Sequence, residues 1–235
     1  MRGCLFVLLL AAAFVGGGLW FGGPPAAGYL IEAGLTSGGL RAEAIDVTVD
    51  TEPRWEVVTG RVDRVEVIAV GASLGDVEAG AIDVDLTGVD LGGRSFEAVS
   101  GTLDEVNVPG ESAAVGPASV ELEGRAEAAR AIVNIPAFAV EELITSAIEA
   151  ETGRAVDRVT LVAPDRIAFR LSGVDAEMTL SLEDGRVVGR TNLGGQNVTL
   201  FDPAESLALQ LDDLRVDEAG LTLSGVLDFA RLLGG

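Results

Sequence analysis

The chain has 235 residues, 37 acidic and 16 basic, so its net charge is -21, and it contains neither Lys nor His. Without imidazole or amine side chains it has no Ser-His, Cys-His or Ser-Lys nucleophile, no Schiff-base lysine and no histidine metal ligand. Cys4 is the single cysteine, which excludes an internal disulfide and a thiolate zinc site. An acidic chain also lacks the basic surface that attracts nucleic acid or anionic lipid headgroups. We therefore expect no nucleic-acid partner, no cofactor, no metal site and no enzymatic activity.

The N-terminal 25 residues are interpreted as a membrane segment. Cys4 to Gly23 contain no charged residue, and Arg2 with the free amino end supplies a positive start. A run of this length matches a spanning helix of about 20 residues and exceeds the core of a signal peptide, about 7 to 15 residues. The sequence predicts a signal anchor, with a secretory signal cleaved near Ala27 as the alternative. In both cases residues 26–235 form a single β-rich domain outside the cytoplasm.

The next segments predict a short helix followed by strands. Gly28 to Leu40 is the short helix, and after it the hydrophobic period changes from 3.6 to 2, which is typical of strands with one buried face. Gly and Pro residues between the alternating runs predict turns. The apolar positions of the expected strands are Ile45, Val47 and Val49; Val65, Val67 and Ala69; Ile82, Val84 and Leu86; Val120 and Leu122; Val159 and Leu161; Ile167, Phe169 and Leu171; Met178, Leu180 and Leu182; Leu207, Leu209 and Leu211; and Leu221 and Leu223.

One long helix is predicted between the two runs of strands, from Ile135 to Gly153. Pro136 suits its first turn and Gly153 suits its end. Its apolar stripe consists of Phe138, Val140, Leu143, Ile144, Ala147 and Ile148.

The ratio of strands to helices constrains the fold. Roughly ten strands each have an apolar face, and one long and one short helix cannot cover them all, so the sheet must curl, pack in two layers or keep an apolar face for a ligand. We expect an α+β fold in which a long curved antiparallel sheet wraps around one main helix. A β-sandwich or barrel whose inner faces fill each other is the alternative.

Two carboxylate pairs are candidates for chemistry. Asp83 and Asp85 share a strand face, where they could hold Ca²⁺ or pair as acid and base, but a solvated strand face has the same pattern. Asp212 and Asp213 lie where the apolar positions switch from odd to even, which indicates a bend.

A short pattern occurs twice. Gly60 to Val67 reads G-R-V-D-R-V-E-V, and Gly153 to Leu161 reads G-R-A-V-D-R-V-T-L. Each copy leads from a glycine into an alternating strand, so we expect the two copies to open two successive β-meanders of one curved sheet.

Several segments together resemble the LmeA-type family of bacterial envelope phospholipid-binding proteins. They are A-E-A-I-D-V-T-V-D, W-E-V-V-T-G-R-V-D-R-V-E-V, A-I-D-V-D-L-T-G-V-D-L, A-I-V-N-I-P-A-F-A-V-E-E-L-I and L-R-V-D-E-A-G-L-T-L-S-G, within residues 40 to 228. The resemblance implies a tubular lipid-binding-like fold, phospholipid as the ligand, and a role in envelope lipid or lipoglycan assembly.

The resulting hypothesis is a lipid-binding protein of the cell envelope that holds acyl chains in an apolar groove. The residues expected to line the groove are Phe138, Leu143, Ile144, Ala147, Ile148, Val65, Val67, Phe169 and Leu171. The headgroup candidates are Arg61, Arg64, Arg154 and Arg158, although solvent-facing arginines paired with nearby Asp would give the same pattern. Two alternatives stay open, a structural or protein-interaction module of the envelope and a carboxylate-dependent enzyme acting on glycans.

Overall fold

A computed structural model describes residues 24–37, 39–52, 59–74, 77–93, 95–108, 115–192, 197–201 and 209–229. The predicted signal anchor, apart from its last two residues, lies outside these ranges. Within them, no helix combines the length and the apolar character needed to span a bilayer.

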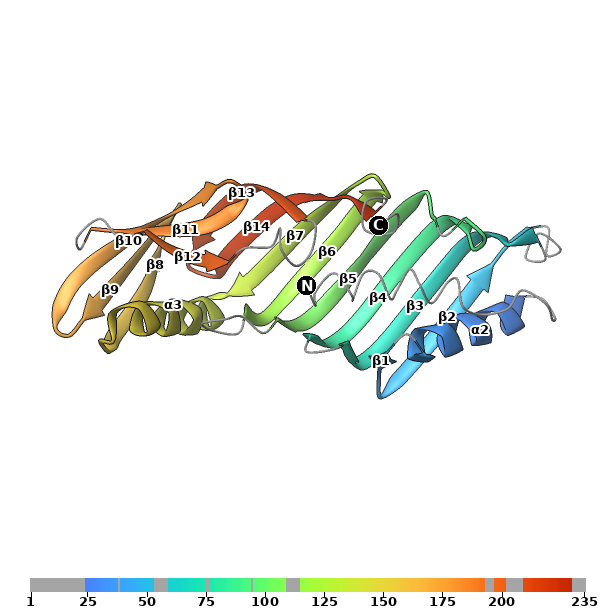
Figure 1. Cartoon of the computed structure of the whole chain (residues 1–235), viewed down its shortest axis with the longest axis horizontal. Helices are drawn as coiled ribbons and strands as arrows, with labels where there is room; N and C mark the ends of the chain where they lie inside the picture. Colours follow the sequence, from blue (N-terminus) through green and yellow to red (C-terminus); the bar gives the residue numbers. More distant parts are fainter. Residues whose placement is uncertain are drawn as a thin grey trace.

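The described strands form two antiparallel sheets in an elongated molecule (Figure 1). The nine-stranded sheet has the order β1-β3-β4-β5-β6-β7-β14-β13, with β2 also paired to β3, and the five-stranded sheet has the order β12-β11-β10-β9-β8. The strands of the first sheet are β1 (Leu40–Arg41), β2 (Ala44–Asp50), β3 (Arg61–Leu74), β4 (Val77–Asp90), β5 (Ala98–Val108), β6 (Val115–Arg125), β7 (Ala128–Pro136), β13 (Leu209–Asp217) and β14 (Gly220–Leu227). Those of the second are β8 (Val156–Val162), β9 (Arg166–Leu171), β10 (Val174–Glu183), β11 (Arg186–Thr191) and β12 (Asn197–Phe201).

The sheet-rich α+β class is confirmed, but the strands do not form one sheet around one helix. Helix α3 (Ala137–Thr152) follows β7 and carries the chain away, so β8 starts a separate sheet, and the edge of β7 pairs with β14 instead. Helix α2 (Pro24–Ser37) packs on β2 at one end of the nine-stranded sheet, while α3 lies at the other end and contacts both sheets (Figure 1). The two sheets also meet directly, since the Val216 N–H of β13 donates a 2.7 Å hydrogen bond to the Pro164 carbonyl oxygen.

One face of the nine-stranded sheet is apolar across eight strands. Cross-strand pairing aligns the inward residues of β2, β3, β4, β5, β6, β7, β14 and β13 in three rows that contain only aliphatic residues and Gly. In that strand order the rows are Ile45, Ala69, Ile82, Leu103, Val120, Val133, Leu223 and Leu214; Val47, Val67, Val84, Gly101, Leu122, Ala131, Gly225 and Leu211; and Val49, Val65, Leu86, Val99, Gly124, Ala129, Leu227 and Leu209. We call these 24 positions the apolar face.

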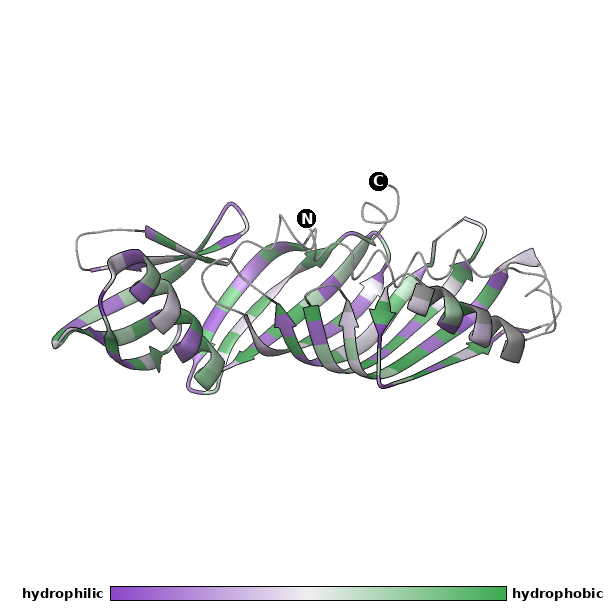
Figure 2. Cartoon of the chain, turned by 60° about the horizontal axis from the view of Figure 1, so that its bottom comes forward, coloured by the Kyte–Doolittle hydropathy of each residue, from purple (hydrophilic) through white to green (hydrophobic). Residues whose placement is uncertain are grey.

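The residues between the rows belong to the opposite, largely polar face, and Figure 2 shows the resulting bands along the strands. Two of its rows are Asp46, Ile68, Asp83, Thr102, Glu121, Ile132, Ser224 and Asp213; and Thr48, Glu66, Asp85, Ser100, Glu123, Arg130, Val226 and Gln210. This segregation is the period-2 alternation that the sequence predicts.

A β-bulge preserves the apolar face in the last strand. The register of β13 against β14 shifts between Leu211 and Asp213, so one residue is left over. Leu211 and Leu214 therefore pair with Gly225 and Leu223 on the same face, although they are three positions apart. The predicted bend at Asp212 and Asp213 is thus a bulge inside one strand.

Helix α3 ends at Gly153, as predicted, but it begins after Pro136, because Ile135 and Pro136 are the last residues of β7. Gly153 has φ 65°, a left-handed conformation, and its N–H donates a 2.8 Å hydrogen bond to the Glu149 carbonyl oxygen. The buried residues are Ala139, Val140, Leu143, Ile144, Ala147 and Ile148. Phe138 was wrongly placed on this stripe, because it lies at the first turn with its side chain 60% exposed.

Candidate functional site

The apolar face is the first candidate, and its side chains differ in exposure. Most are buried, for example Ile82 at 1% and Val84 at 3%. Val120 and Leu122 on β6, Val133 on β7 and Ile45 and Val47 on β2 are half-buried. The face therefore offers accessible apolar surface chiefly over β6 and β7 and at the β2 edge.

The second candidate is a pocket at the C-terminal end of α3, with a volume of about 580 Å³, which we call the helix-end pocket. It unites four of the predicted site residues: Ile148, Phe169, Leu171 and Arg154. The remaining lining residues are Glu151, Thr152, Ser172, Val174, Thr191 and Val198. A pocket of this size is in the ordinary range for a small ligand.

Local hydrogen bonds fix the rim of the helix-end pocket. The Thr152 hydroxyl donates to the Ile148 carbonyl oxygen at 2.7 Å and lies 3.2 Å from the Arg154 N–H, which donates to it. A carboxylate oxygen of Glu149 accepts a hydrogen bond from the Val156 N–H at 3.1 Å. The chain leaving α3 is thus held on both sides of Arg154 and enters β8 in a defined direction.

The apolar lining that β9 gives to the helix-end pocket follows from the alternation of buried and exposed side chains along this strand. Ile167, Phe169 and Leu171 point to the buried side of the five-stranded sheet, while Arg166 and Arg170 are exposed. Leu171 pairs with Val174 across the turn, and Val174 is exposed at the pocket. Val174 and Val198 were missed as site residues, although the apolar alternation in N-V-T-L-F pointed to Val198.

The other predicted lining residues do not reach this pocket. Leu143, Ile144 and Ala147 are buried along α3, and Phe138 is at the opposite end of that helix. Val65 and Val67 belong to the apolar face on β3. The structure thus divides the predicted groove residues among the helix-end pocket, the core and the apolar face.

The four arginines predicted to bind a headgroup differ in their ion pairing and in their location. Arg64 donates two hydrogen bonds to the Asp85 carboxylate, at 2.6 and 2.8 Å, and these raise the pKa of the guanidinium. Arg61, Arg154 and Arg158 form no ion pair with any residue in the described ranges. Of these three, Arg154 lines the helix-end pocket.

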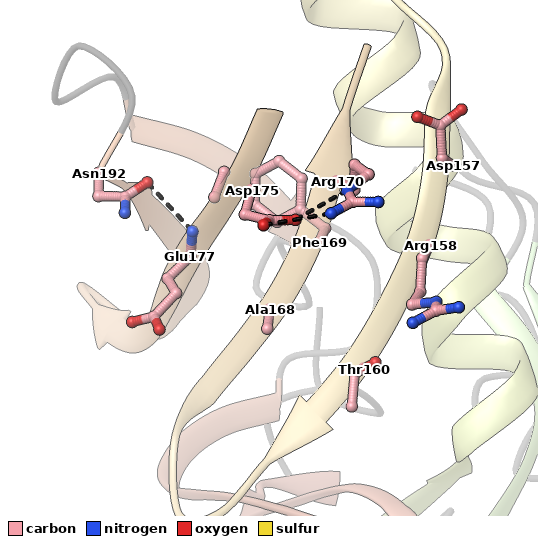
Figure 3. Close-up of a pocket in the computed structure, with 10 residues that line it drawn as sticks. Asp157, Arg158, Thr160, Ala168, Phe169, Arg170, Asp175, Glu177 and Asn192 are labelled. Carbon is pink, nitrogen blue, oxygen red and sulfur yellow. Dashed lines mark hydrogen bonds and ion pairs between the residues drawn. The ribbon is translucent and has the colours of Figure 1, made fainter. Parts of the chain in front are cut away.

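Arg158 lines a third site, a polar pocket of about 370 Å³ on the other face of the five-stranded sheet (Figure 3). Arg170 and Asp175 form an ion pair there, with Nε 2.8 Å from Oδ1, and Asn192 accepts a 3.0 Å hydrogen bond from the Glu177 N–H. Hydrogen bonding and charge attraction from Arg170 lower the pKa of Asp175.

A lowered pKa is the opposite of what a glycosidase general acid needs. Asp175 is therefore a poor candidate for the acid of a two-carboxylate mechanism. Over the described ranges, no three Asp, Glu, His or Cys side chains gather closely enough to hold a metal ion. Asp83 and Asp85 share the polar face as expected, and Asp85 is occupied by Arg64.

Comparisons with known proteins give no match. No family model matches the chain, and neither a curated protein nor a solved structure does so. The resemblance to the LmeA-type family therefore stays a prediction.

Proposed function

We propose that this chain is an extracytoplasmic phospholipid-binding protein of the bacterial cell envelope. In this proposal acyl chains lie against the apolar face, and the membrane segment predicted at residues 1–25 places the domain beside the bilayer. The role is in envelope lipid or lipoglycan assembly, and the fold is a variant of a tubular lipid-binding module.

The observation that carries the proposal is the extent of the apolar face. Its three rows contain no polar side chain over eight strands, while the rows between them are rich in Asp and Glu. With strands about 4.8 Å apart, eight strands span about 34 Å, which is comparable to the roughly 30 Å hydrocarbon core of a bilayer. Acyl chains need apolar contact and no polar partner, and this surface has that character.

The accessible part of the face is where a lipid would bind first. Val120, Leu122 and Val133 are half-buried neighbours on β6 and β7. Other positions in the same rows, such as Ile82 and Val84 on β4, are already removed from solvent. A lipid that reached them would replace contacts that the chain makes with itself.

That burial favours a second candidate function, a non-enzymatic structural or protein-interaction module of the envelope. A face filled by the chain's own side chains stabilises the fold and needs no ligand. Under this alternative the polar face, with its many carboxylates, would hold a partner protein.

One labelling experiment separates the two functions. Leu122 and Glu123 are adjacent in β6 and point to opposite faces. In the full-length Cys4→Ser chain, Leu122→Cys and Glu123→Cys would each carry a small fluorophore, and the protein would be mixed with phosphatidylcholine vesicles containing brominated acyl chains. We expect quenching at position 122 and little at position 123.

An organic extract of the purified full-length protein, analysed by mass spectrometry, supplies the second measurement. Lipid binding predicts co-purified phospholipid near equimolar amounts. Equal quenching at both positions together with a lipid-free extract would reject the proposal and favour the interaction module.

A further inference from the structure

The helix-end pocket combines one cation, one anion and an apolar floor. Glu151 and Arg154 lie three residues apart at the end of α3 and line the same pocket. Its accessible apolar lining is the exposed Val174 and the half-buried Val198, next to the buried Ile148, Phe169 and Leu171. Neither charged side chain forms an ion pair with a described residue. Elsewhere in the described ranges most arginines do, namely Arg64, Arg125, Arg130, Arg166, Arg170, Arg190 and Arg215.

The C-terminal end of α3 adds a partial negative charge at the helix-end pocket. The C-terminal carbonyl groups of a helix carry partial negative charge, which stabilises a nearby cation. A ligand ammonium group beside Glu151 would experience both the carboxylate and the helix end. A ligand phosphate needs a cation instead, and among the described residues that line the pocket Arg154 alone supplies one.

The net charge of the protein narrows the ligand class. With a charge of -21, the chain repels a headgroup that carries net negative charge. A zwitterionic headgroup carries no net charge, so its approach is not opposed by this field. Its phosphate and ammonium groups, joined by a two-carbon bridge, match a site with one Arg and one Glu.

We propose that the helix-end pocket binds the headgroup of a zwitterionic phospholipid. The phosphate contacts Arg154, the ammonium group contacts Glu151, and the ester region and first acyl carbons lie against Val174 and Val198. This inference deepens the proposed function, on which it rests, by naming the lipid class and the place of its headgroup. It gives the acidic chain a way to bind phospholipid without a basic surface.

The test uses native mass spectrometry of the full-length protein, released from neutral maltoside micelles, with soluble dihexanoyl lipids added. The ligands are the phosphatidylethanolamine, the anionic phosphatidylglycerol and the uncharged diacylglycerol, which lacks a headgroup phosphate. The variants are Arg154→Gln and Glu151→Gln. Arg125→Gln and Glu127→Gln are the matched controls, because Arg125 and Glu127 form an exposed pair, 3.7 Å apart, at the turn between β6 and β7.

We expect the wild-type protein to bind phosphatidylethanolamine more tightly than either other lipid. Loss of one charge-assisted contact should weaken its binding about tenfold in Arg154→Gln and by a similar factor in Glu151→Gln. Glu151→Gln should at the same time improve binding of phosphatidylglycerol, because a repelling carboxylate has been removed. The control variants should bind all three lipids as the wild type does.

Three results would overturn the inference: equal or tighter binding of phosphatidylglycerol by the wild type, unchanged binding in both pocket variants, or an equal loss in the control variants. Thermal unfolding of every variant identifies any loss that is due to misfolding, and Val198→Trp, which fills the pocket from β12, then serves as the second test. If these variants bind normally while the label at Leu122 is still quenched by lipid, the headgroup assignment fails and the proposed function survives. If lipid does not quench the label at position 122 either, both the headgroup assignment and the proposed function are rejected.

Discussion

Arg64 on β3 and Asp85 on β4 lie diagonally across the polar face and are joined by two hydrogen bonds, of 2.6 and 2.8 Å. Glu66 is a further acidic neighbour, 3.9 Å from the same guanidinium. On the other side of the sheet, Val65 and Leu86 are paired in the apolar face. This ion pair therefore links the strands on the side opposite the apolar rows, and it removes Arg64 from the set of free headgroup ligands.

We expect Arg64→Gln and Asp85→Asn each to lower the thermal unfolding temperature slightly, and more so in low salt than in 1 M NaCl. Exposed pairs are screened by water and ions, so their net contribution to folding is small. A double-mutant cycle measured at both salt concentrations isolates the coupling. Coupling that stays the same in high salt would contradict this account. Lipid binding should not change in either variant.

The Arg170 and Asp175 pair predicts a pH dependence of stability. Its hydrogen bonds and charge attraction lower the pKa of Asp175 below its ordinary value of 3.8. A carboxyl group with a lowered folded-state pKa stabilises the folded protein above its unfolded pKa, and this contribution is lost as the pH falls through the folded-state pKa. The stability difference between the wild type and Asp175→Asn should be constant at pH values well above the unfolded-state pKa and should shrink as the pH falls through the lowered folded-state pKa. Urea unfolding at a series of pH values measures it, and a difference that grows toward low pH would refute the assignment.

The effect of Gly28→Ala on the free energy of unfolding tests whether α2 packs on β2, because its sign depends on that contact. A methyl group at Gly28 would lie 2.5 Å from the Val47 carbonyl oxygen of β2. In an unhindered helix, Gly→Ala stabilises the protein by about 1 kcal/mol. Here we expect Gly28→Ala to destabilise it by about 1–3 kcal/mol, because the helix must move away from the strand.

Ala33 is the matched control on the same helix, since its side chain is exposed. Ala33→Gly should lower the free energy of unfolding by only about 1 kcal/mol through helix propensity. A stabilising Gly28→Ala would show that α2 does not pack on β2 in solution.

Two residues of the predicted helix stripe should respond very differently to truncation. Ile144 is 1% exposed and Phe138 is 60% exposed. Ile144→Ala removes buried methyl groups and leaves a cavity, so it should cost about 2–5 kcal/mol of unfolding free energy. Phe138→Ala should change the unfolding free energy by no more than about 0.5 kcal/mol. Chemical denaturation of the two variants checks this, and similar losses in both would mean that α3 is rotated relative to the structure.

Local patterns explain what the sequence could predict. The alternation of Ile82, Val84 and Leu86 depends only on neighbouring residues, so their shared face was predictable, and the same holds for the stop of α3 at Gly153. The second copy of the repeated pattern does open a β-meander, at β8, whereas the first lies in β3, the second strand of a meander that begins at β2. The meanders belong to different sheets, however, because β7 pairs with β14 instead of β8. That pairing joins residues such as Val133 and Leu223, far apart in the chain, and no local pattern specifies it.

The candidate site was predictable to a similar degree. Phe169 and Leu171 were chosen because they alternate within one strand, and Ile148 because of its place on a helix stripe. Their meeting with Arg154 in one pocket depends on how α3 packs on β8 and β12 and on the turn after Gly153. Glu151 was missed because a glutamate near a helix end resembles any solvated residue. Its significance comes from the three-dimensional setting alone.

The β-bulge in β13 has a consequence for how the length of the apolar face can change. Side chains in a strand alternate, so one extra residue normally turns everything beyond it to the other side. At Leu211 and Asp213 the extra residue is set aside, and Leu214 continues the row begun at Ile45. If Asp212 stayed and β13 paired without the bulge, the strand beyond Leu211 would turn over and Arg215 would face the aliphatic rows. Deleting Asp212 would instead remove the extra residue and leave Leu214 on the apolar face. The extent of the apolar face toward the five-stranded sheet therefore depends on this bulge in the backbone pairing, and not on which side chain occupies position 212.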